Sequence, residues 1–425
     1  MKILDSSKKN FYNELNKILD KRKTVDRSTL KIVEKIINDV RKNKDKALIK
    51  YEKRFNANSR IIPDNKDISR AIKSIDPKIK KAIDDTCKRV KDWHVKQKPK
   101  DIFYKDKLNN KFYYKNKAIN SVACYVPGNL PSSLIMSATP ALIAGVKRIV
   151  LCTPSLNGKL NGSVYYAAKK LGIKEYYSLS GASAIMALAS GTKKVKAVNK
   201  IVGAGSKWVA LAKKIVFLEG LCGVESANYG PSEILVIGDS FTSPDIAASS
   251  MLAQSEHSGD NLAVLVTKDS KLIKNTQLSI KDQLKDLPRN KIAGKSLNNY
   301  GVIIRVENDR KIISICNHIG PEHIEILSKN YKKYLNKNLI AGSVCIGPYS
   351  SMALSDYGPT QHSLPTISSS KFSSGLGVKD FLTQTSYNEL SKKGVAKLGK
   401  SGILLSEIES LMGHNISIKK RMEKK

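Results

Sequence analysis

Asn120-Ser-Val-Ala-Cys-Tyr-Val-Pro-Gly128 is a short apolar run that ends in a turn, and it begins the pattern that decides the fold. Two similar runs follow, Arg148-Ile-Val-Leu-Cys-Thr-Pro154 and Lys200-Ile-Val-Gly203, and the residues between them have helical patterns. Short apolar runs that alternate with helices are typical of a parallel sheet covered by helices. We therefore expect an α/β unit over about 125–232.

The alternation resumes after Pro231 and predicts a second α/β unit. Its expected strands are Glu233–Gly238, Leu262–Thr267, Gly301–Val306 and Ser343–Gly347, with a helix at 243–257. Outside the two units the chain has a different character. Residues 1–120 are polar with helical spacing, most clearly at 25–55 and 67–97, and the residues beyond 377 predict a helical, Lys-rich tail.

Charge and composition exclude some classes of protein. The 425 residues carry a formal net charge of +37, which raises the hypothesis of a nucleic-acid-binding protein. The excess is mostly Lys, it extends from Lys2 to Lys425, and no nucleic-acid recognition motif accompanies it. We therefore favour compositional drift and expect no nucleic-acid partner. A hydrophobic content of 41% argues against a disordered polycation.

Neither a membrane span nor a secretory signal is expected. The longest apolar region, Ser133–Cys152, is interrupted by Pro140, Lys147 and Arg148, and residues 1–10 lack an apolar core. The six cysteines are scattered without a CxxC pair, which favours reduced thiols and a cytoplasmic protein.

Four short motifs offer side chains for chemistry, and each has a plainer interpretation. Gln254 and His257 share a helix face and could bind one metal ion, or could lie on the surface. Gly320-Pro-Glu-His323 could be a proton-handling pair or a helix N-terminus. Asp356 and His362 lie in a predicted loop, where Asp356 could also cap a turn. Glu409–His414 could simply end a helix of the tail.

In their order along the chain, these motifs resemble the histidinol dehydrogenases. The resemblance covers about Lys23 to the C-terminus, and the combination is far more specific than any single piece. The matching pieces are Tyr125-Val-Pro-Gly128, Ala138-Thr-Pro-Ala141, Tyr229-Gly-Pro-Ser-Glu-Ile-Leu-Val-Ile237, Gln254-Ser-Glu-His257, Gly320-Pro-Glu-His323, Ser355-Asp-Tyr357, His362-Ser-Leu-Pro-Thr366, Phe372-Ser-Ser-Gly-Leu376 and Glu409–His414.

The resemblance implies an enzyme that oxidises L-histidinol to L-histidine with two NAD and one Zn²⁺ per subunit, the last step of histidine biosynthesis. Its implied site residues fall into four groups. The zinc ligands would be Gln254, His257, Asp356 and His414, the acid–base pair Glu322 and His323, further substrate contacts Ser232, His362 and Glu409, and NAD contacts Tyr125, Ser183 and Ser206. The zinc ligands and His323 would also border the substrate.

The implied fold is α/β, with two incomplete Rossmann-like units. Residues 1–22 would form a helical segment. Residues 23–124 and 233–376 would form a first α/β domain with the zinc and catalytic residues, and 125–232 a second on the NAD side. The tail, 377–425, would cross to the partner of a homodimer, so that His414 and Glu409 complete the neighbour's site.

Three departures from the family pattern leave an alternative open. Ser183 and Ser206 stand where members usually have Gln and Asn, the loop after Gly128 is shorter than usual, and the spacing from Asp356 to His362 is one residue short. Serine cannot present the paired donor and acceptor of an amide. The alternative is a related zinc-dependent dehydrogenase of another amino or hydroxy alcohol.

Overall fold

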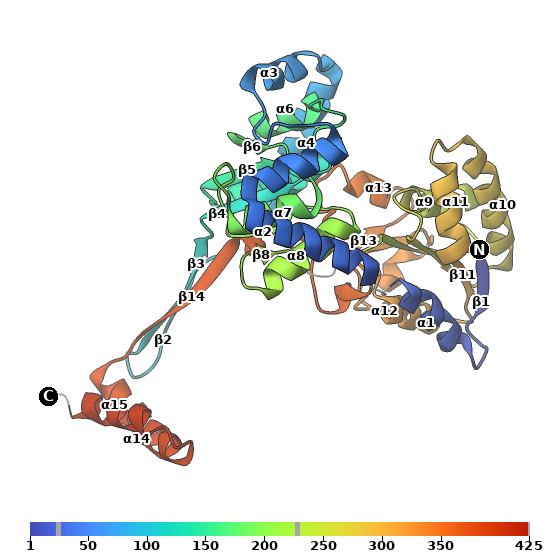
Figure 1. Ribbon diagram of the computed structural model, residues 1–425. Coiled ribbons are helices and arrows are strands. Elements are labelled where there is room, and N and C mark those ends of the chain that lie inside the picture. Colours follow the sequence, from blue (N-terminus) through green and yellow to red (C-terminus); the bar gives the residue numbers. More distant parts are fainter. Residues whose placement is uncertain (23–26, 226–229, 424–425) are drawn as a thin grey trace.

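The computed structural model describes residues 1–22, 27–225 and 230–423. In Figure 1 these residues form two lobes and a long arm that carries the C-terminus. Each lobe is built on one parallel sheet, and the arm is built on an antiparallel one. The expected α/β class with parallel-sheet cores is confirmed.

The first lobe contains a six-stranded parallel sheet. Helices α1 and α12 pack with one face of the sheet, and helices α9, α10 and α11 pack with the other. All six residues of both β9 and β10 are buried, as expected for central strands covered on two faces. The strand order is β1 (Lys2–Asp5), β11 (Gly301–Arg305), β10 (Leu262–Thr267), β9 (Glu233–Gly238), β12 (His323–Ile326) and β13 (Ser343–Ile346). The helices are α1 (Phe11–Lys21), α9 (Pro244–Ser255), α10 (Ser270–Asp286), α11 (Asn290–Tyr300), α12 (Asp309–Ile319) and the short α13 (Met352–Ser355).

The second lobe contains a five-stranded parallel sheet. Helices α2, α7 and α8 contribute to the core on one face, and α3 to α6 contribute to the core on the other. The strand order is β6 (Glu175–Tyr177), β5 (Arg148–Cys152), β4 (Ser121–Tyr125), β7 (Lys200–Val202) and β8 (Gly223–Val224). The helices are α2 (Arg27–Asn56), α3 (Asn65–Lys73), α4 (Pro77–His94), α5 (Pro131–Ala144), α6 (Gly162–Lys170), α7 (Gly181–Ser190) and α8 (Lys207–Leu218).

The N-terminal hundred residues differ from the expectation in two ways. Residues 1–22 are not only helical, because β1 adds an edge strand to the six-stranded sheet by pairing with β11. Helices α2 to α4, which we expected in the zinc-bearing domain with 233–376, pack on the five-stranded sheet instead. A helical pattern shows which face of a helix is apolar but not which sheet covers it, so the sequence could not decide this assignment.

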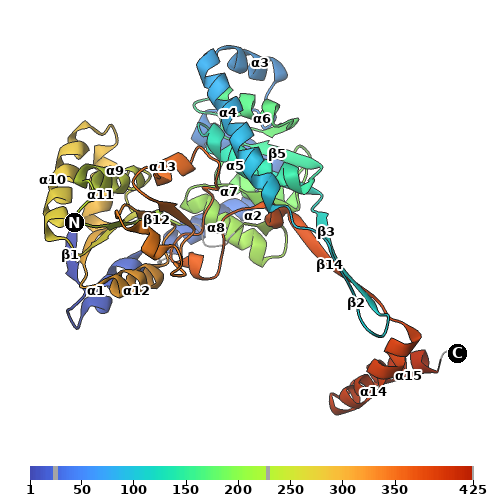
Figure 2. The same ribbon diagram turned by 180° about the vertical axis from the view of Figure 1, so that it is seen from behind.

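The arm also differs from the expectation, because it begins with strands. β14 (Leu382–Glu389) pairs antiparallel with β3 (Lys111–Ala118), and β3 pairs with β2 (Ile102–Lys105). Only then do helices α14 (Lys392–Ile408) and α15 (Met412–Met422) follow. In both Figure 1 and Figure 2 the ribbon carries these two helices away from the lobes. Most residues of these strands are exposed, and β14 pairs with a strand that is distant in the sequence. The sequence therefore contains no local apolar run from which the strands could be predicted.

Two further sequence expectations concern membranes and thiols. Within the described residues, no helix has the length and apolar character that a membrane crossing needs. All six cysteines are free and buried, as expected from their scattered positions.

Candidate active site

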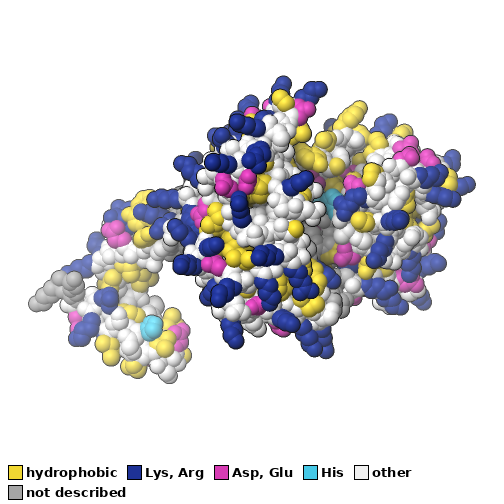
Figure 3. Space-filling view, turned by 45° about the horizontal axis from the view of Figure 1, so that its top comes forward, with side chains coloured by type: hydrophobic (Ala, Val, Ile, Leu, Met, Phe, Trp, Pro, Cys, Tyr) yellow, Lys and Arg dark blue, Asp and Glu magenta, His cyan; other side chains and the backbone are white. Residues whose placement is uncertain are grey.

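Four of the expected site residues come together at the amino ends of β9 and β12, which are neighbours in the six-stranded sheet. Ser232 immediately precedes β9, Glu322 immediately precedes β12, and His323 is the first residue of β12. Helix α9 leads back from the carboxyl end of β9 toward the start of β10, and Gln254 lies in its last turn. Figure 3 shows a histidine side chain in the hollow between the two lobes.

Glu322 is the centre of the polar contacts. Its Oε2 accepts hydrogen bonds from the Glu233 N–H at 3.0 Å and from Gln254 Nε2 at 3.2 Å. The Ser232 side chain also interacts favourably with this carboxylate. Burial raises the pKa of Glu322 to about 8, and the negative charges of Glu233 and Asp356 add to the rise.

His323 lies beside this carboxylate, with Nε2 3.8 Å from Oε1 of Glu322. Burial, together with the nearby His362 and His257, lowers the pKa of His323 to about 3. The imidazole is therefore neutral near pH 7 and is able to accept a proton. Its Nδ1 is buried and has no hydrogen-bond partner among the described residues.

Asp356 and His362 form a second pair on the loop that follows α13. The His362 Nδ1 lies 3.3 Å from the Asp356 carbonyl oxygen and 3.9 Å from the carboxylate Oδ1. Burial raises the pKa of Asp356 and lowers the pKa of His362, while the charge of each opposes the shift of the other. The charge of His257 lowers the pKa of both residues.

Gln254 has an oxygen that is available to a ligand. Its Nε2 donates to Glu322, while its Oε1 is buried without a partner in the described part of the chain. A buried acceptor without a partner costs about 1–3 kcal/mol, so a cation or donor at this point would be favourable. Gln254, His257 and Asp356 are three of the four expected zinc ligands.

The fourth expected ligand, His414, and the substrate contact Glu409 are not brought to this site within one chain. Both are exposed, and both lie at the end of the arm, Glu409 as the C-cap of α14 and His414 within α15. Correspondingly, the residues that the structure describes contain no group of three His, Cys, Asp or Glu side chains that could hold a metal ion. Of the three expected ligands Gln254, His257 and Asp356, only His257 and Asp356 belong to these four residue types.

The three expected NAD contacts lie in the second lobe, at the carboxyl edge of its sheet. Tyr125 ends β4, Ser206 caps α8 after β7, and β4 and β7 are adjacent. The sheet order reverses between these two strands, which is where doubly wound sheets bind ligands. Ser206 is exposed, whereas Ser183 is 3% exposed and its hydroxyl donates to the Ser180 carbonyl at 2.9 Å.

Buried acidic residues support two loops near Tyr125, the one that contains Ser180 and the one that contains Gly203. Glu52 accepts hydrogen bonds from the N–H and hydroxyl of Ser180, and Glu225 accepts one from the Gly203 N–H at 2.8 Å. Lys213 pairs with Glu225 and donates to the Gly203 carbonyl. Sequence reasoning missed these residues.

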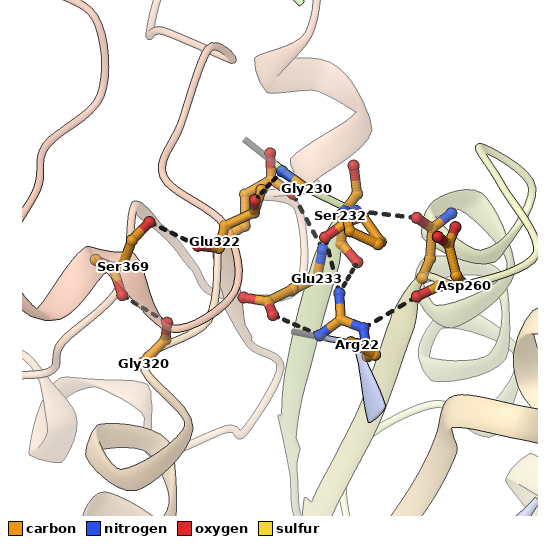
Figure 4. A network of polar contacts seen from close by, with 12 residues as sticks. Arg22, Gly230, Ser232, Glu233, Asp260, Gly320, Glu322 and Ser369 are labelled. Atoms are coloured by element: carbon orange, nitrogen blue, oxygen red, sulfur yellow. Dashed lines mark hydrogen bonds and ion pairs between the residues drawn. The ribbon is translucent and has the colours of Figure 1, made fainter. Parts of the chain in front are cut away.

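A buried ion pair supports the base of the candidate site, and sequence reasoning missed this too. Arg22 bonds Glu233, with both side chains 1% exposed. Figure 4 shows Arg22 on one side of the Ser232–Glu233 stretch and Glu322 on the other. One signal could have found the pair: Glu233 opens a strand that is otherwise apolar. Tyr229, part of the adjoining motif, lies outside the described residues.

Known proteins resemble the chain over nearly its whole length. The family model described as histidinol dehydrogenase matches residues 19–422. The chain is 50% identical to a histidinol dehydrogenase of Pelagibacter ubique (strain HTCC1062), with 100% of both chains covered. It is 36% identical to one of Carboxydothermus hydrogenoformans, with 96% of this chain and 98% of the relative covered. The crystal structure of histidinol dehydrogenase from Elizabethkingia anophelis superposes with a TM-score of 0.92 at 29% identity, over 100% of this chain and 98% of that one.

Proposed function

The chain belongs to the histidinol dehydrogenase family, the oxidoreductases of the last step of histidine biosynthesis, and from this premise we propose that it oxidises L-histidinol to L-histidine with zinc and two NAD. The observation that carries the proposal is the convergence of Gln254, His257 and Asp356 beside Glu322 and His323. These residues come from three separate parts of the chain.

Zinc fits the side chains at this point. Gln254 offers an oxygen without a partner, Asp356 offers a carboxylate, and His257 offers an imidazole, which is a donor set that Zn²⁺ accepts. The fourth ligand would be His414 of a second copy of the chain. When bound, zinc would hold and orient the imidazole and amine nitrogens of the substrate.

The proton transfers would be made by Glu322 and His323. The neutral His323 would accept the hydroxyl proton of histidinol at Nε2. NAD, when bound, would supply the oxidant that takes the hydride from the carbon, which yields histidinal. The ionised form of Glu322 would then accept a proton from the water that adds to the aldehyde. The hydrate would lose its hydride to the second NAD and its remaining proton to solvent. Ser232, His362 and the partner's Glu409 would hold the polar groups of the substrate and the carboxylate that forms.

NAD would bind at the carboxyl edge of the second lobe, where Tyr125 and Ser206 lie. Ser183 would contribute little direct contact, because its hydroxyl is already bonded to Ser180. The backbone of the loop from Gly203 to Ser206 would then replace part of what the usual amides supply. The net charge of +37 would attract anionic NAD to the enzyme.

A homodimer with shared sites is supported by two sets of exposed apolar side chains. On the arm they include Ile102, Phe103 and Tyr104, each 59% exposed, and Leu404, Ile408 and Met412 on the two helices. Beside the site, Leu354 and Tyr357 flank Asp356 and are 62% and 58% exposed. Apolar surfaces of this extent mark interfaces, so the arm of one copy would cover the site rim of the other. We place the enzyme in the cytoplasm, which the six free cysteines support.

The test is an assay of the purified, zinc-saturated protein with L-histidinol and NAD. We expect about two NADH for each histidine formed, as the oxidation of an alcohol to a carboxylate requires. Other amino alcohols, assayed in parallel, test the alternative of a related dehydrogenase. Absence of both NADH and histidine with L-histidinol, together with turnover of another alcohol, would replace this proposal by that alternative.

A further inference from the structure

Arg22 approaches the base of the candidate site from the side opposite Glu322 (Figure 4). It follows α1 directly, and its side chain is 1% exposed. The guanidinium donates to Glu233 Oε1 at 2.5 Å, to the Asp260 carbonyl at 3.0 Å, and to the carbonyls of Pro231 and Ser232 at 2.7 and 3.2 Å. One side chain therefore holds three main-chain oxygens and one carboxylate.

The peptide between Ser232 and Glu233 connects Arg22 to the catalytic group. Its carbonyl oxygen accepts from Arg22, and its N–H donates to Glu322 Oε2 at 3.0 Å. Asn261 holds the same segment from another side, since its Oδ1 accepts from the Ser232 N–H at 2.9 Å and its Nδ2 donates to the Gln254 carbonyl at 2.8 Å. A shift of this peptide would therefore move Glu322 relative to His323 and Gln254.

Stability alone does not explain this arrangement. Replacing a buried ion pair by well-packed hydrophobic residues of similar volume is often neutral or stabilising, because two charges no longer have to be desolvated. A guanidinium is, however, the side chain that presents five donors in a planar fork, and it can hold several acceptors at fixed angles. At this point the acceptors belong to the segment that bonds Glu322.

We propose that Arg22 is a positioning residue for the reaction: it fixes the Ser232–Glu233 peptide, and this peptide holds the Glu322 carboxylate in place. The proposal rests on the function proposed above. It also gives the N-terminal segment a role, because Arg22 connects β1 and α1 to the catalytic group.

The experiment compares two neutralised ion pairs in the full-length protein. The double variant Arg22→Met/Glu233→Gln removes both buried charges and keeps the N–H of residue 233. The control, Arg148→Met/Glu175→Gln, removes a less buried arginine that has contacts of the same kind. Arg148 also bonds one carboxylate, Glu175, and two carbonyls, those of Lys196 and Ala197, but it does so at the amino edge of the other sheet. The measurements are kcat, KM for NAD and for L-histidinol, zinc content and Tm.

For Arg22→Met/Glu233→Gln we expect kcat to fall about 10²-fold, since misplacement of a reacting group by about 1 Å has that effect. KM for NAD and zinc content should remain unchanged, and the control should keep the kcat of the unaltered protein. A double variant with unaltered kcat would overturn the proposal, because Arg22 would then be merely structural.

A second variant keeps the test decisive if the double variant does not fold. Arg22→Lys retains the charge opposite Glu233 but lacks the planar fork for the carbonyls, so kcat should fall while Tm changes little. Unaltered kcat in a stable Arg22→Lys protein would likewise overturn the proposal. If the unaltered protein does not oxidise histidinol, the proposed function is wrong. If only the Arg22 variants keep an unaltered kcat, the proposed function stands and the role of Arg22 is wrong.

Discussion

Glu322 and His323 are adjacent in the sequence, and their side chains approach each other to 3.8 Å between Oε1 and Nε2. Adjacent residues within a strand point to opposite faces of the sheet. The two can meet because Glu322 precedes β12 and only His323 belongs to it. Burial then shifts both pKa values toward the neutral forms, to about 8 for Glu322 and about 3 for His323.

Replacing His323 should separate catalysis from metal binding. In His323→Asn we expect kcat to fall about 10²- to 10⁴-fold, because the proton acceptor is lost, while zinc content is retained. His318→Asn is the control, since His318 lies on α12 and bonds Asn16 outside the site. Steady-state kinetics and metal analysis measure the two effects. Unaltered turnover in His323→Asn would remove this residue from the mechanism.

The raised pKa of Glu322 predicts a pH dependence of stability in the metal-free protein. An ordinary glutamate has a pKa near 4.5, and the buried Glu322 has one of about 8. Between these values the folded chain binds a proton that the unfolded chain has lost. The contribution of Glu322 to the free energy of unfolding therefore falls as pH rises, by at most about 1.4 kcal/mol per pH unit.

Urea unfolding at pH 5.5 and pH 8.5, with a chelator present, measures this contribution. The difference in stability between the unaltered protein and Glu322→Gln should shift in favour of the variant at the higher pH. Glu175→Gln is the control: Arg148 lowers the pKa of Glu175, so its titration lies below this pH window. Parallel pH profiles for the unaltered protein and Glu322→Gln would contradict the prediction.

Mixing two inactive variants tests whether His414 acts on the partner's site. His257→Ala and His414→Ala should each lose zinc and activity. In a mixed dimer, one site would combine the intact His257 of one chain with the intact His414 of the other. Random mixing should then restore about a quarter of the active sites. If the mixture stays as inactive as its components, His414 does not complete a neighbour's site.

Gly203 offers a test of the NAD side. Its φ is +111°, and a Cβ at this position would collide with the Tyr125 carbonyl oxygen, a backbone atom that cannot easily move. In Gly203→Ala we expect the Kd for NAD to rise at least about tenfold, with zinc content unchanged. Gly172→Ala is the matched control, because Gly172 has a φ of +73° and open space around it.

The matched pair separates two effects of an alanine. Both substitutions carry the strain of a left-handed backbone, about 1–2 kcal/mol. Only Gly203→Ala adds a collision beside Tyr125, so NAD titration by fluorescence should distinguish the variants even where their Tm values agree. Equal Kd values for the two variants would show that this loop does not contact NAD.

Much of the fold could be predicted from the sequence, because its signals are local. The buried strands β4, β5, β9 and β10 are continuous apolar runs, and such runs are visible without a structure. The exposed ribbon of the arm could not be predicted in this way. Its strands β3 and β14 contain no continuous apolar run. Each forms by pairing with the other, which is distant in the sequence.

The candidate site, like the fold, could be predicted only in part from the sequence. The sequence alone determined the family and predicted which residues carry the chemistry, since ordered motifs such as Gln254-Ser-Glu-His257 are a property of the chain itself. Only the tertiary structure decided how those residues are supported and tuned. The bonds of Arg22 to the segment beneath Glu322, and the burial that shifts the pKa values of Glu322 and His323, depend on contacts between distant segments. Residue identity is local, whereas desolvation and hydrogen-bond geometry arise only when the chain has packed.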